Sequence, residues 1–207
     1  MKILISLLFV FLSGYSNFVF SQETIGVKSS TKGFSIGGHG AYLSYTASSL
    51  QFEPHTGYGF GGYLQYGFTH QIAVALNVQH YWMDPKTTEL IKSPYPYTEI
   101  DLIGKYIFGS TNSPVRPFLS LGGNYSTQEE MFYDISDPNL KKIDATYSGF
   151  TACGGAGINF FLTPRFTIDL SGLYHLGAFG VTQNGTHYDA TYDFTAFKFL
   201  GGFSYHF

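Results

Sequence analysis

Apolar and polar residues alternate with a period of two in eight segments of this 207-residue chain. The clearest segment is 71–82, where one parity holds Ile72, Val74, Leu76, Val78 and Trp82. The same alternation recurs in 33–45, 57–68, 97–108, 115–126, 148–161, 166–176 and 192–207. Alternation of this kind predicts β-strands with one apolar face, whereas a helix would repeat every 3.6 residues. The sequence therefore predicts an all-β fold of eight strands.

The connections between these segments differ in length in a regular way. Short turns are predicted at 68–71, 109–114 and 163–165. Long polar loops are predicted near 46–56, 83–96, 127–147 and 177–191. An even number of strands with short turns at one end and long loops at the other is typical of bacterial outer-membrane barrels. We therefore expect an eight-stranded antiparallel up-and-down transmembrane β-barrel with short periplasmic turns and long extracellular loops.

The amino terminus has the pattern of a secretory signal peptide. Lys2 precedes an apolar run, and smaller residues follow up to Ser21. We expect cleavage after Ser21 or at the next bond. Cleavage after Ser21 divides the chain into a signal peptide, a short periplasmic segment and the barrel, at 1–21, 22–31 and 32–207. An uncleaved anchor helix is the alternative, but Ser13 and Gly14 interrupt the run, and a spanning helix needs ~20 mostly apolar residues.

A soluble eight-stranded barrel of the lipocalin type is the main alternative fold. It would place apolar residues inside and charged residues outside. Here only 12% of the residues are charged, and the charges within strands lie opposite the aromatic face of their own strand. Asp193, at the rim of the last strand, is the exception. In water, the apolar faces would form a larger exposed patch than soluble proteins tolerate, so the pattern favours lipid.

The charges within the strands are the sharpest candidate site. They are three acids and three bases, namely Glu99, Asp101, Lys105, Arg116, Asp169 and Lys198. Because eight strands enclose a space just wide enough for side chains, we expect a buried salt-bridge network that plugs the lumen. Pairing Leu176 with Thr191 in the last hairpin would place Asp169 opposite Lys198. A selective channel lining is the alternative role for these charges.

The seven histidines and the single cysteine do not follow a metal-binding or catalytic pattern. Inward positions at different heights are expected for His39, His175 and His206, and loop positions for His55 and His187. No two histidines are two residues apart, which would place both on one face of a strand, and none has a cysteine partner as in a ligand set. Cys153 is expected to be a small inward residue. His175 has no neighbouring serine, so the Ser–His–acid arrangement has no support. We expect no catalytic residues, no metal and no cofactor.

The last strand is the most specific part of the sequence, because aromatic residues alternate up to its end in Phe203-Ser204-Tyr205-His206-Phe207. With the Gly-Gly pairs and the Thr163-Pro164-Arg165 turn, residues 30–207 resemble the small eight-stranded outer-membrane barrels related to OmpA and OmpX. The resemblance implies that Phe203, Tyr205 and Phe207 are read by the outer-membrane assembly machinery. No peptidoglycan-binding domain of the kind found in full-length OmpA relatives is expected.

The resemblance also implies a monomeric integral protein of the outer membrane of a Gram-negative-type bacterium, in contact with lipid and lipopolysaccharide. The barrel is then a scaffold, and we expect a structural role together with contacts between the loops and host or other surface ligands. A small porin or an OmpW-like passage for small molecules is the alternative, and a lipid-modifying enzyme is a weaker one. A net charge of −3 gives no basis for nucleic-acid binding.

Overall fold

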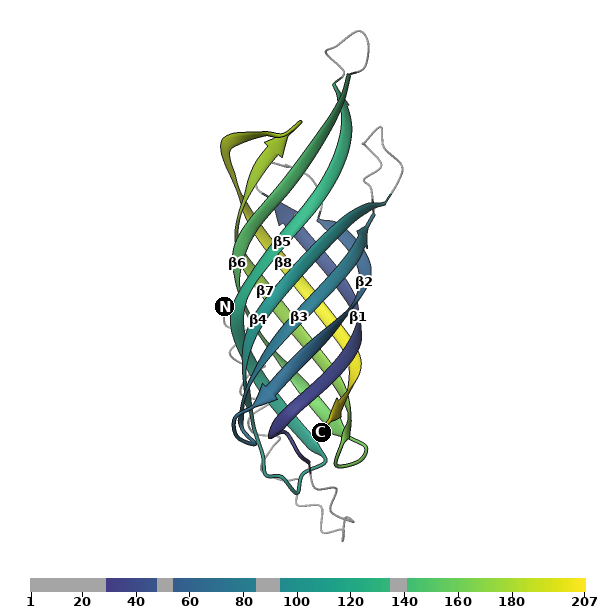
Figure 1. Ribbon diagram of the computed structural model, residues 1–207, viewed down its shortest axis with the longest axis vertical. Helices are drawn as coiled ribbons and strands as arrows, with labels where there is room; N and C mark the ends of the chain where they lie inside the picture. The colour runs from purple at the N-terminus through teal and green to yellow at the C-terminus, as the bar shows by residue number, and fades with distance from the viewer. Residues whose placement is uncertain (1–28, 48–53, 85–93, 135–140) are drawn as a thin grey trace, which may run out of the picture.

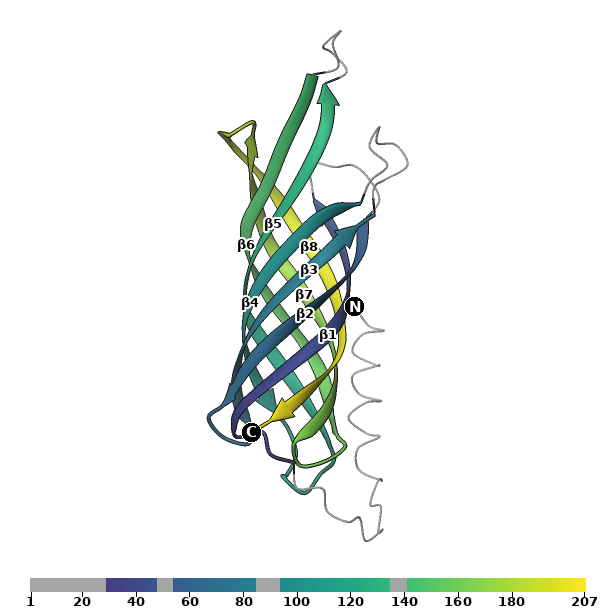
Figure 2. The same ribbon diagram turned by 45° about the vertical axis from the view of Figure 1, so that its right-hand side comes forward.

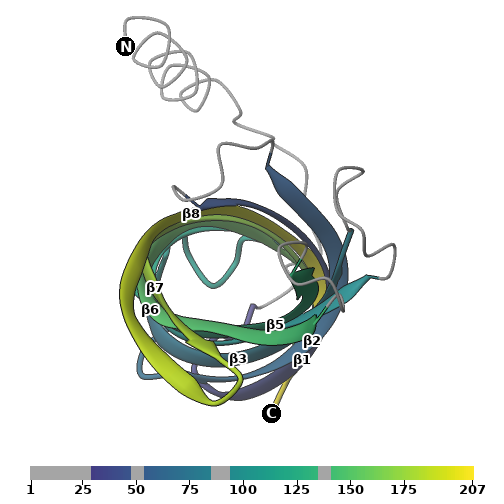
Figure 3. The same ribbon diagram turned by 90° about the horizontal axis from the view of Figure 1, so that it is seen from above.

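Eight strands form one closed antiparallel barrel (Figures 1 and 3). The computed structural model describes residues 29–47, 54–84, 94–134 and 141–207, so the expected signal peptide and its cleavage site lie outside the described residues. The strands are β1 (Gly33–Ala47), β2 (His55–Gly67), β3 (Ile72–Met83), β4 (Tyr95–Ile107), β5 (Val115–Asp134), β6 (Lys141–Phe161), β7 (Phe166–Gln183) and β8 (Thr186–His206). Each strand pairs with the next, and β8 pairs with β1, which confirms the predicted topology.

No helix within the described ranges is long and apolar enough to cross a membrane.

The stagger of the strands sets the width of the barrel. Steps from partner to partner around the barrel start at Gly37 and pass through Tyr63, Asn77, Asp101, Asn124, Thr151, Gly177 and Phe194. The last step returns to β1 at Ala47, ten residues beyond the start. For eight strands, this stagger corresponds to a tilt of roughly 40–45° and to an interior that side chains can fill.

The outward side chains form an apolar surface around the whole barrel. A broad aliphatic band contains Ile36, Leu64, Leu76, Val78, Ile100, Leu102, Leu119, Leu121, Ile168 and Leu170. Aromatic residues lie on both sides of this band, as in the Tyr42–Tyr58 pair at one end and the Phe34–Tyr66 pair at the other. Leu121 and Phe150 are 74% and 78% exposed, which is compatible with lipid and not with water.

Two hairpins are longer than expected, because 127–147 and 177–191 are mostly strand and not loop. The β5–β6 hairpin rises above the other strands (Figures 1 and 2). The β7–β8 hairpin closes through Asn184–Gly185, whose positive φ values of 47° and 81° suit a two-residue turn. The alternation does not predict these extensions, because strands beyond the lipid carry polar residues on both faces.

Inward glycines make room for larger side chains from neighbouring strands. A Cβ atom on Gly61 would lie 2.7 Å from His39 Nε2, and one on Gly202 would lie 2.6 Å from His39 Cβ. Both distances are too short for any larger residue to fit without movement. These glycines therefore relieve crowding inside a narrow barrel.

Candidate functional site

Three charged side chains from facing walls of the barrel meet in its interior. Lys198 on β8 reaches across the lumen to Glu99 and Asp101 on β4, which lies four strands away around the ring. Lys198 Nζ lies 2.5 Å from Glu99 Oε1 and 2.7 Å from Asp101 Oδ2, and none of the three side chains is more than 1% exposed. We call these three residues the central ion cluster. Buried charges are tolerated only when they are paired and hydrogen-bonded, so their neighbours matter.

Polar neighbours complete the hydrogen bonding of the central ion cluster. Asn124 Nδ2 donates to both carboxylates, at 3.1 Å to Glu99 and 2.5 Å to Asp101. Gln79 donates to Asp101 at 2.9 Å and accepts a hydrogen bond from the ammonium at 2.8 Å. The Tyr81 hydroxyl donates to Glu99 at 2.9 Å. The cluster and these neighbours together bridge the lumen from wall to wall.

The central ion cluster also lies beside a histidine. His175, Glu99 and Asp101 each offer one ligand atom, and these atoms lie within 4.8 Å of one another. However, the Lys198 ammonium already lies within 2.7 Å of one oxygen in each carboxylate. An ammonium and a metal cation compete for the same oxygen atoms, so the geometry favours ion pairing at this place.

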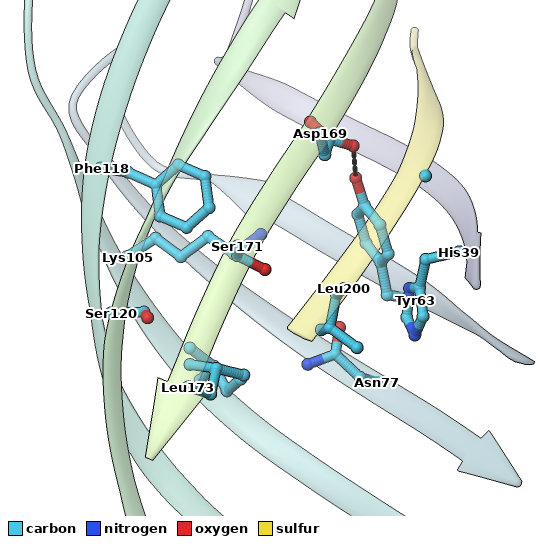
Figure 4. A pocket seen from close by; sticks show the side chains of 12 residues that line it. His39, Tyr63, Asn77, Lys105, Phe118, Ser120, Asp169, Ser171, Leu173 and Leu200 are labelled. Atoms are coloured by element: carbon cyan, nitrogen blue, oxygen red, sulfur yellow. Dashed lines mark hydrogen bonds between the residues drawn. The ribbon is translucent and has the colours of Figure 1, made fainter. Parts of the chain in front are cut away.

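Two further charges line a small cavity that lies nearer to the short turns than the central ion cluster does. Figure 4 shows the side chains around this cavity. This cavity has a volume of about 30 Å³, and Lys105 and Asp169 face it. Lys105 Nζ lies 5.0 Å from the ring centroids of both Tyr63 and Phe118. Tyr63 donates a hydrogen bond to Asp169 Oδ2 at 2.6 Å. A cavity of this size, with two charged groups facing it, is large enough for one or two water molecules, which would hydrate the charges.

The expected placement of Asp169 opposite Lys198 is wrong. Lys198 pairs with Leu173, and Asp169 pairs with Gly202. The tight turn at Asn184–Gly185 and a β-bulge between β7 and β8 set this register, and Leu176 consequently pairs with Thr195 instead of Thr191. As a result, Asp169 belongs to the lower cavity and Lys198 to the central ion cluster.

Arg116 is buried at the end of the lumen nearest the short turns. Its Nη1 donates to Thr31 Oγ1 at 2.9 Å. Its remaining donors bind the backbone carbonyls of His70, Phe108 and Gly109 at 2.5, 3.2 and 3.3 Å. Arg116 and Thr31 are 0% and 1% exposed. One guanidinium thus ties the segment before β1 to two periplasmic turns, and the six predicted charges fall into three separate groups.

Aromatic side chains fill the lumen on the other side of the central ion cluster. Tyr45 stacks on His55 with ring centroids 5.0 Å apart, and Phe194 lies 5.3 Å from Tyr45. The Tyr95 hydroxyl lies 2.9 Å from the Tyr45 hydroxyl and 2.6 Å from His55 Nδ1. The expected loop positions of two histidines are wrong, because His55 begins β2 and His187 lies in β8.

The remaining predicted inward residues are buried, namely His39, His175, His206 and Cys153. At the periplasmic end, His206 Nε2 lies 2.9 Å from Thr167 Oγ1 and 3.4 Å from Ser204 Oγ. Both hydroxyl-bearing residues are at most 1% exposed and face the lumen. Lipid around the barrel meets only outward side chains, so this serine–histidine contact gives no support to a lipid-modifying activity.

Comparison with known proteins adds evidence on the fold. No protein-family model matches the sequence, and no curated protein matches it either. Among solved structures, neisserial surface protein A has a TM-score of 0.60 and 15% identity, covering 85% of this chain and 98% of its own. OprG from Pseudomonas aeruginosa has a TM-score of 0.59 and 17% identity, covering 87% and 99%. Ail from Yersinia pestis has a TM-score of 0.54 and 17% identity, covering 85% and 99%.

At these identities the likeness concerns the fold, and that fold is the small outer-membrane β-barrel. The apolar exterior and the polar, hydrogen-bonded interior agree with it, because they are the reverse of a soluble barrel. The chain therefore has the architecture of an integral outer-membrane β-barrel protein.

Proposed function

We propose that this chain is an integral outer-membrane protein of a Gram-negative-type bacterium whose lumen is closed and whose function lies in its extracellular hairpins. In this proposal residues 1–21 direct export and are removed, residues 22–31 stay in the periplasm, and residues 32–207 form a monomeric barrel in contact with lipid and lipopolysaccharide. Phe203, Tyr205 and Phe207 guide assembly by the barrel assembly machinery. All three are exposed on the outer face of β8 and its end, where such machinery can reach them.

The central ion cluster is the observation that best supports a closed lumen. The three charges and their polar neighbours bridge the barrel from β8 to β4. Arg116 closes the periplasmic end independently. An ion entering the lumen would have to displace hydrogen-bonded buried charges, and leaving such a charge unpaired costs several kcal/mol. This makes a plug a better interpretation of these charges than a channel lining.

The long β5–β6 and β7–β8 hairpins support a surface role. They extend beyond the apolar band, and exposed loops and hairpins on a rigid scaffold are common binding elements. One structure of Ail was solved in complex with the heparin analogue sucrose octasulfate, so a barrel of this fold is able to hold a ligand. For the present chain we propose contact with host or other surface ligands through the same end of the barrel.

Planar-bilayer recording tests the closed lumen. Purified wild-type protein should insert without producing stable unitary currents. A Lys198→Ala, Glu99→Ala and Asp101→Ala variant, which removes the central ion cluster, serves as the matched open control and should conduct more. Stable single-channel currents from the wild-type protein would overturn the plug.

A shortened hairpin tests the surface role. Gln128 pairs with Tyr147, so residues 129–146 can be replaced by Asn-Gly and still leave a closed hairpin. This variant should keep its gel mobility shift on boiling but lose adhesion or serum survival. Adhesion and serum survival both equal to those of the wild-type protein would contradict a surface role for this hairpin.

Transport of small molecules is the second candidate function. A cavity of about 30 Å³ in the upper lumen favours it, and its wall is mostly aromatic but includes Gln128 and Glu130. That volume is far below the ~300–1,000 Å³ of typical small-molecule pockets, so transport would require side chains to move. Uptake of small solutes into proteoliposomes, equal for wild-type protein and empty vesicles, is the result that the plug predicts.

A further inference from the structure

The lower cavity, the space of about 30 Å³ that Lys105 and Asp169 face, is rich in hydrogen-bond donors. Tyr63 lines it too, but its hydroxyl already donates to Asp169 at 2.6 Å. The other lining side chains that can donate are His39, Asn77, Lys105, Ser120 and Ser171, from β1, β3, β4, β5 and β7 (Figure 4). Asp169 is the one lining side chain that can only accept. The cavity therefore suits an occupant that accepts hydrogen bonds.

Two of these donors lack a protein partner. Ser120 Oγ and His39 Nε2 are buried and make no hydrogen bond within the part of the chain that the structure describes. Each of the two residues is only 8% exposed. Buried polar atoms in folded proteins almost always bind protein, water or an ion. Two unsatisfied atoms on one small cavity indicate that something other than protein occupies it.

Lys105 places a positive charge beside the unsatisfied Ser120 hydroxyl. The two residues are direct partners across the β4–β5 pair, where Cβ atoms are ~4.5–5.5 Å apart. The Lys105 ammonium lies 5.0 Å from the ring centroids of Tyr63 and Phe118 and is attracted by Asp169. Among the described residues, no oxygen or nitrogen atom accepts a hydrogen bond from it. One acceptor between the ammonium and the hydroxyl would satisfy both donors.

The charge distribution favours a negatively charged acceptor. In the half of the barrel next to the short turns, the basic residues of the described chain are Lys32, Lys105, Arg116 and Arg165, and the acidic residue is Asp169. Lys105 and Asp169 offset each other, so the surplus positive charge comes from the other three. Arg116 donates only to a hydroxyl and to backbone carbonyls, so no carboxylate neutralises it. A field of this sign raises the local concentration of anions.

The size of the cavity narrows the anion. About 30 Å³ has room for one or two particles the size of a water molecule. Chloride is only slightly larger than water, whereas sulfate and organic carboxylates are too bulky. Water alone would satisfy the hydrogen bonds but would leave the surplus charge in place. We propose that the lower cavity binds one chloride ion between the Lys105 ammonium and the Ser120 hydroxyl, with His39 as a further donor.

The central ion cluster confines such an ion to the lower cavity. It combines two carboxylates with one ammonium, so it repels an anion from the rest of the lumen. The chloride site needs only the barrel and its cavity, and its tests measure stability and ion position. They therefore give the same answer whether or not the barrel conducts.

Urea unfolding in lipid vesicles, with sodium chloride compared to sodium gluconate at equal ionic strength, tests the proposal. An ion that binds only the folded state stabilises it as its concentration rises. The unfolding midpoint should therefore rise with chloride and level off. Gluconate, which is too large for the cavity, should leave the midpoint unchanged. Equal midpoints in the two salts at every concentration would show that the cavity holds no chloride and would overturn the proposal.

Matched serine variants locate the effect. Ser126 is a buried inward serine on the same strand as Ser120 and does not line the cavity. Ser120→Ala should raise the half-saturating chloride concentration at least fivefold, and Ser126→Ala less than twofold. Lys105→Met should abolish the chloride dependence, and a chloride dependence that persists in it would overturn the site. If Lys105→Met does not fold, the serine pair decides, because equal effects of its two members would also overturn the site.

Bromide locates the ion directly. Crystals of the wild-type protein grown in bromide should show an anomalous peak within hydrogen-bonding distance of Lys105 Nζ and Ser120 Oγ. The same crystals of Ser126→Ala should keep this peak, and those of Ser120→Ala should show it weakened. Density for water with no anomalous peak in the wild-type cavity would contradict the chloride site.

Discussion

Lys198 and Asp101 form a 2.7 Å ion pair in which neither side chain has any exposed surface. The two residues are 97 positions apart in the sequence and lie on strands four places apart around the ring. The same ammonium also reaches Glu99 at 2.5 Å. One lysine therefore pairs with two buried carboxylates, and its removal would leave both of them without a cation.

Replacing Lys198 should destabilise the folded barrel. Lys198→Met leaves two buried carboxylates without their cation and should lower the free energy of unfolding by about 3–5 kcal/mol. Urea unfolding in lipid vesicles, followed by gel mobility, measures the loss. Adding Glu99→Gln and Asp101→Asn should restore most of it. Lys32→Met removes an exposed lysine and is the control. If Lys198→Met lowered the free energy of unfolding no more than Lys32→Met does, the ion pairs of Lys198 would not stabilise the barrel.

Arg116 and Thr31 should be energetically coupled. A hydrogen bond from a charged group is worth about 1.5–3 kcal/mol, and the guanidinium donates to the threonine hydroxyl at 2.9 Å. A double-mutant cycle of Arg116→Met and Thr31→Val measures the coupling free energy. Effects that add to within ~0.5 kcal/mol would show that this contact does not hold the segment before β1 in place.

The apolar exterior should tolerate charge only outside the lipid. Leu121 is 74% exposed in the aliphatic band, so Leu121→Arg should lower the free energy of unfolding in vesicles by about 2–4 kcal/mol. Glu129→Arg, four residues beyond the aromatic position Tyr125 on the same face of β5, should have little effect. The band would not be the lipid-facing region if both variants behaved alike.

The last residue should matter more for assembly than for stability. Phe207 is 70% exposed, and its contact with β1 is a backbone hydrogen bond to Phe34 at 3.0 Å. Phe207→Ser should therefore fold normally from urea in vitro but reach the outer membrane several-fold less in cells. Phe34→Ser changes a similarly exposed aromatic, 63%, and should reach the membrane normally. Equal amounts of the two variants in the outer membrane would show that Phe207 is not part of an assembly signal.

Strand parity was sufficient to predict which charges face the lumen. Glu99, Asp101 and Lys198 lie on the side opposite the aliphatic residues of their strands, and a one-residue slip would reverse every side chain. Which charges meet was not predictable, because that depends on the register of distant strands. The Asn184–Gly185 dipeptide is a strong hairpin signal, and using it would have extended β7 and β8 correctly.

The hydrogen-bonding partners of the charges were harder to find. Gln79 and Asn124 occupy inward positions in the sequence pattern, but nothing local connects them to Glu99. Tyr63 and Tyr81 are aromatic residues that face the lumen, whereas the aromatics of the pattern were assigned to the lipid. A tyrosine suits either environment, since its ring is apolar and its hydroxyl needs a partner.

Gel mobility with and without boiling, combined with membrane fractionation, tests the central claim most directly. An outer-membrane barrel resists detergent at room temperature, because every strand is hydrogen-bonded on both sides and leaves no free edge. We expect the unboiled protein to migrate differently from the boiled protein and to be found in the outer-membrane fraction. A protein with unchanged mobility that is recovered in the soluble fraction would contradict the central claim.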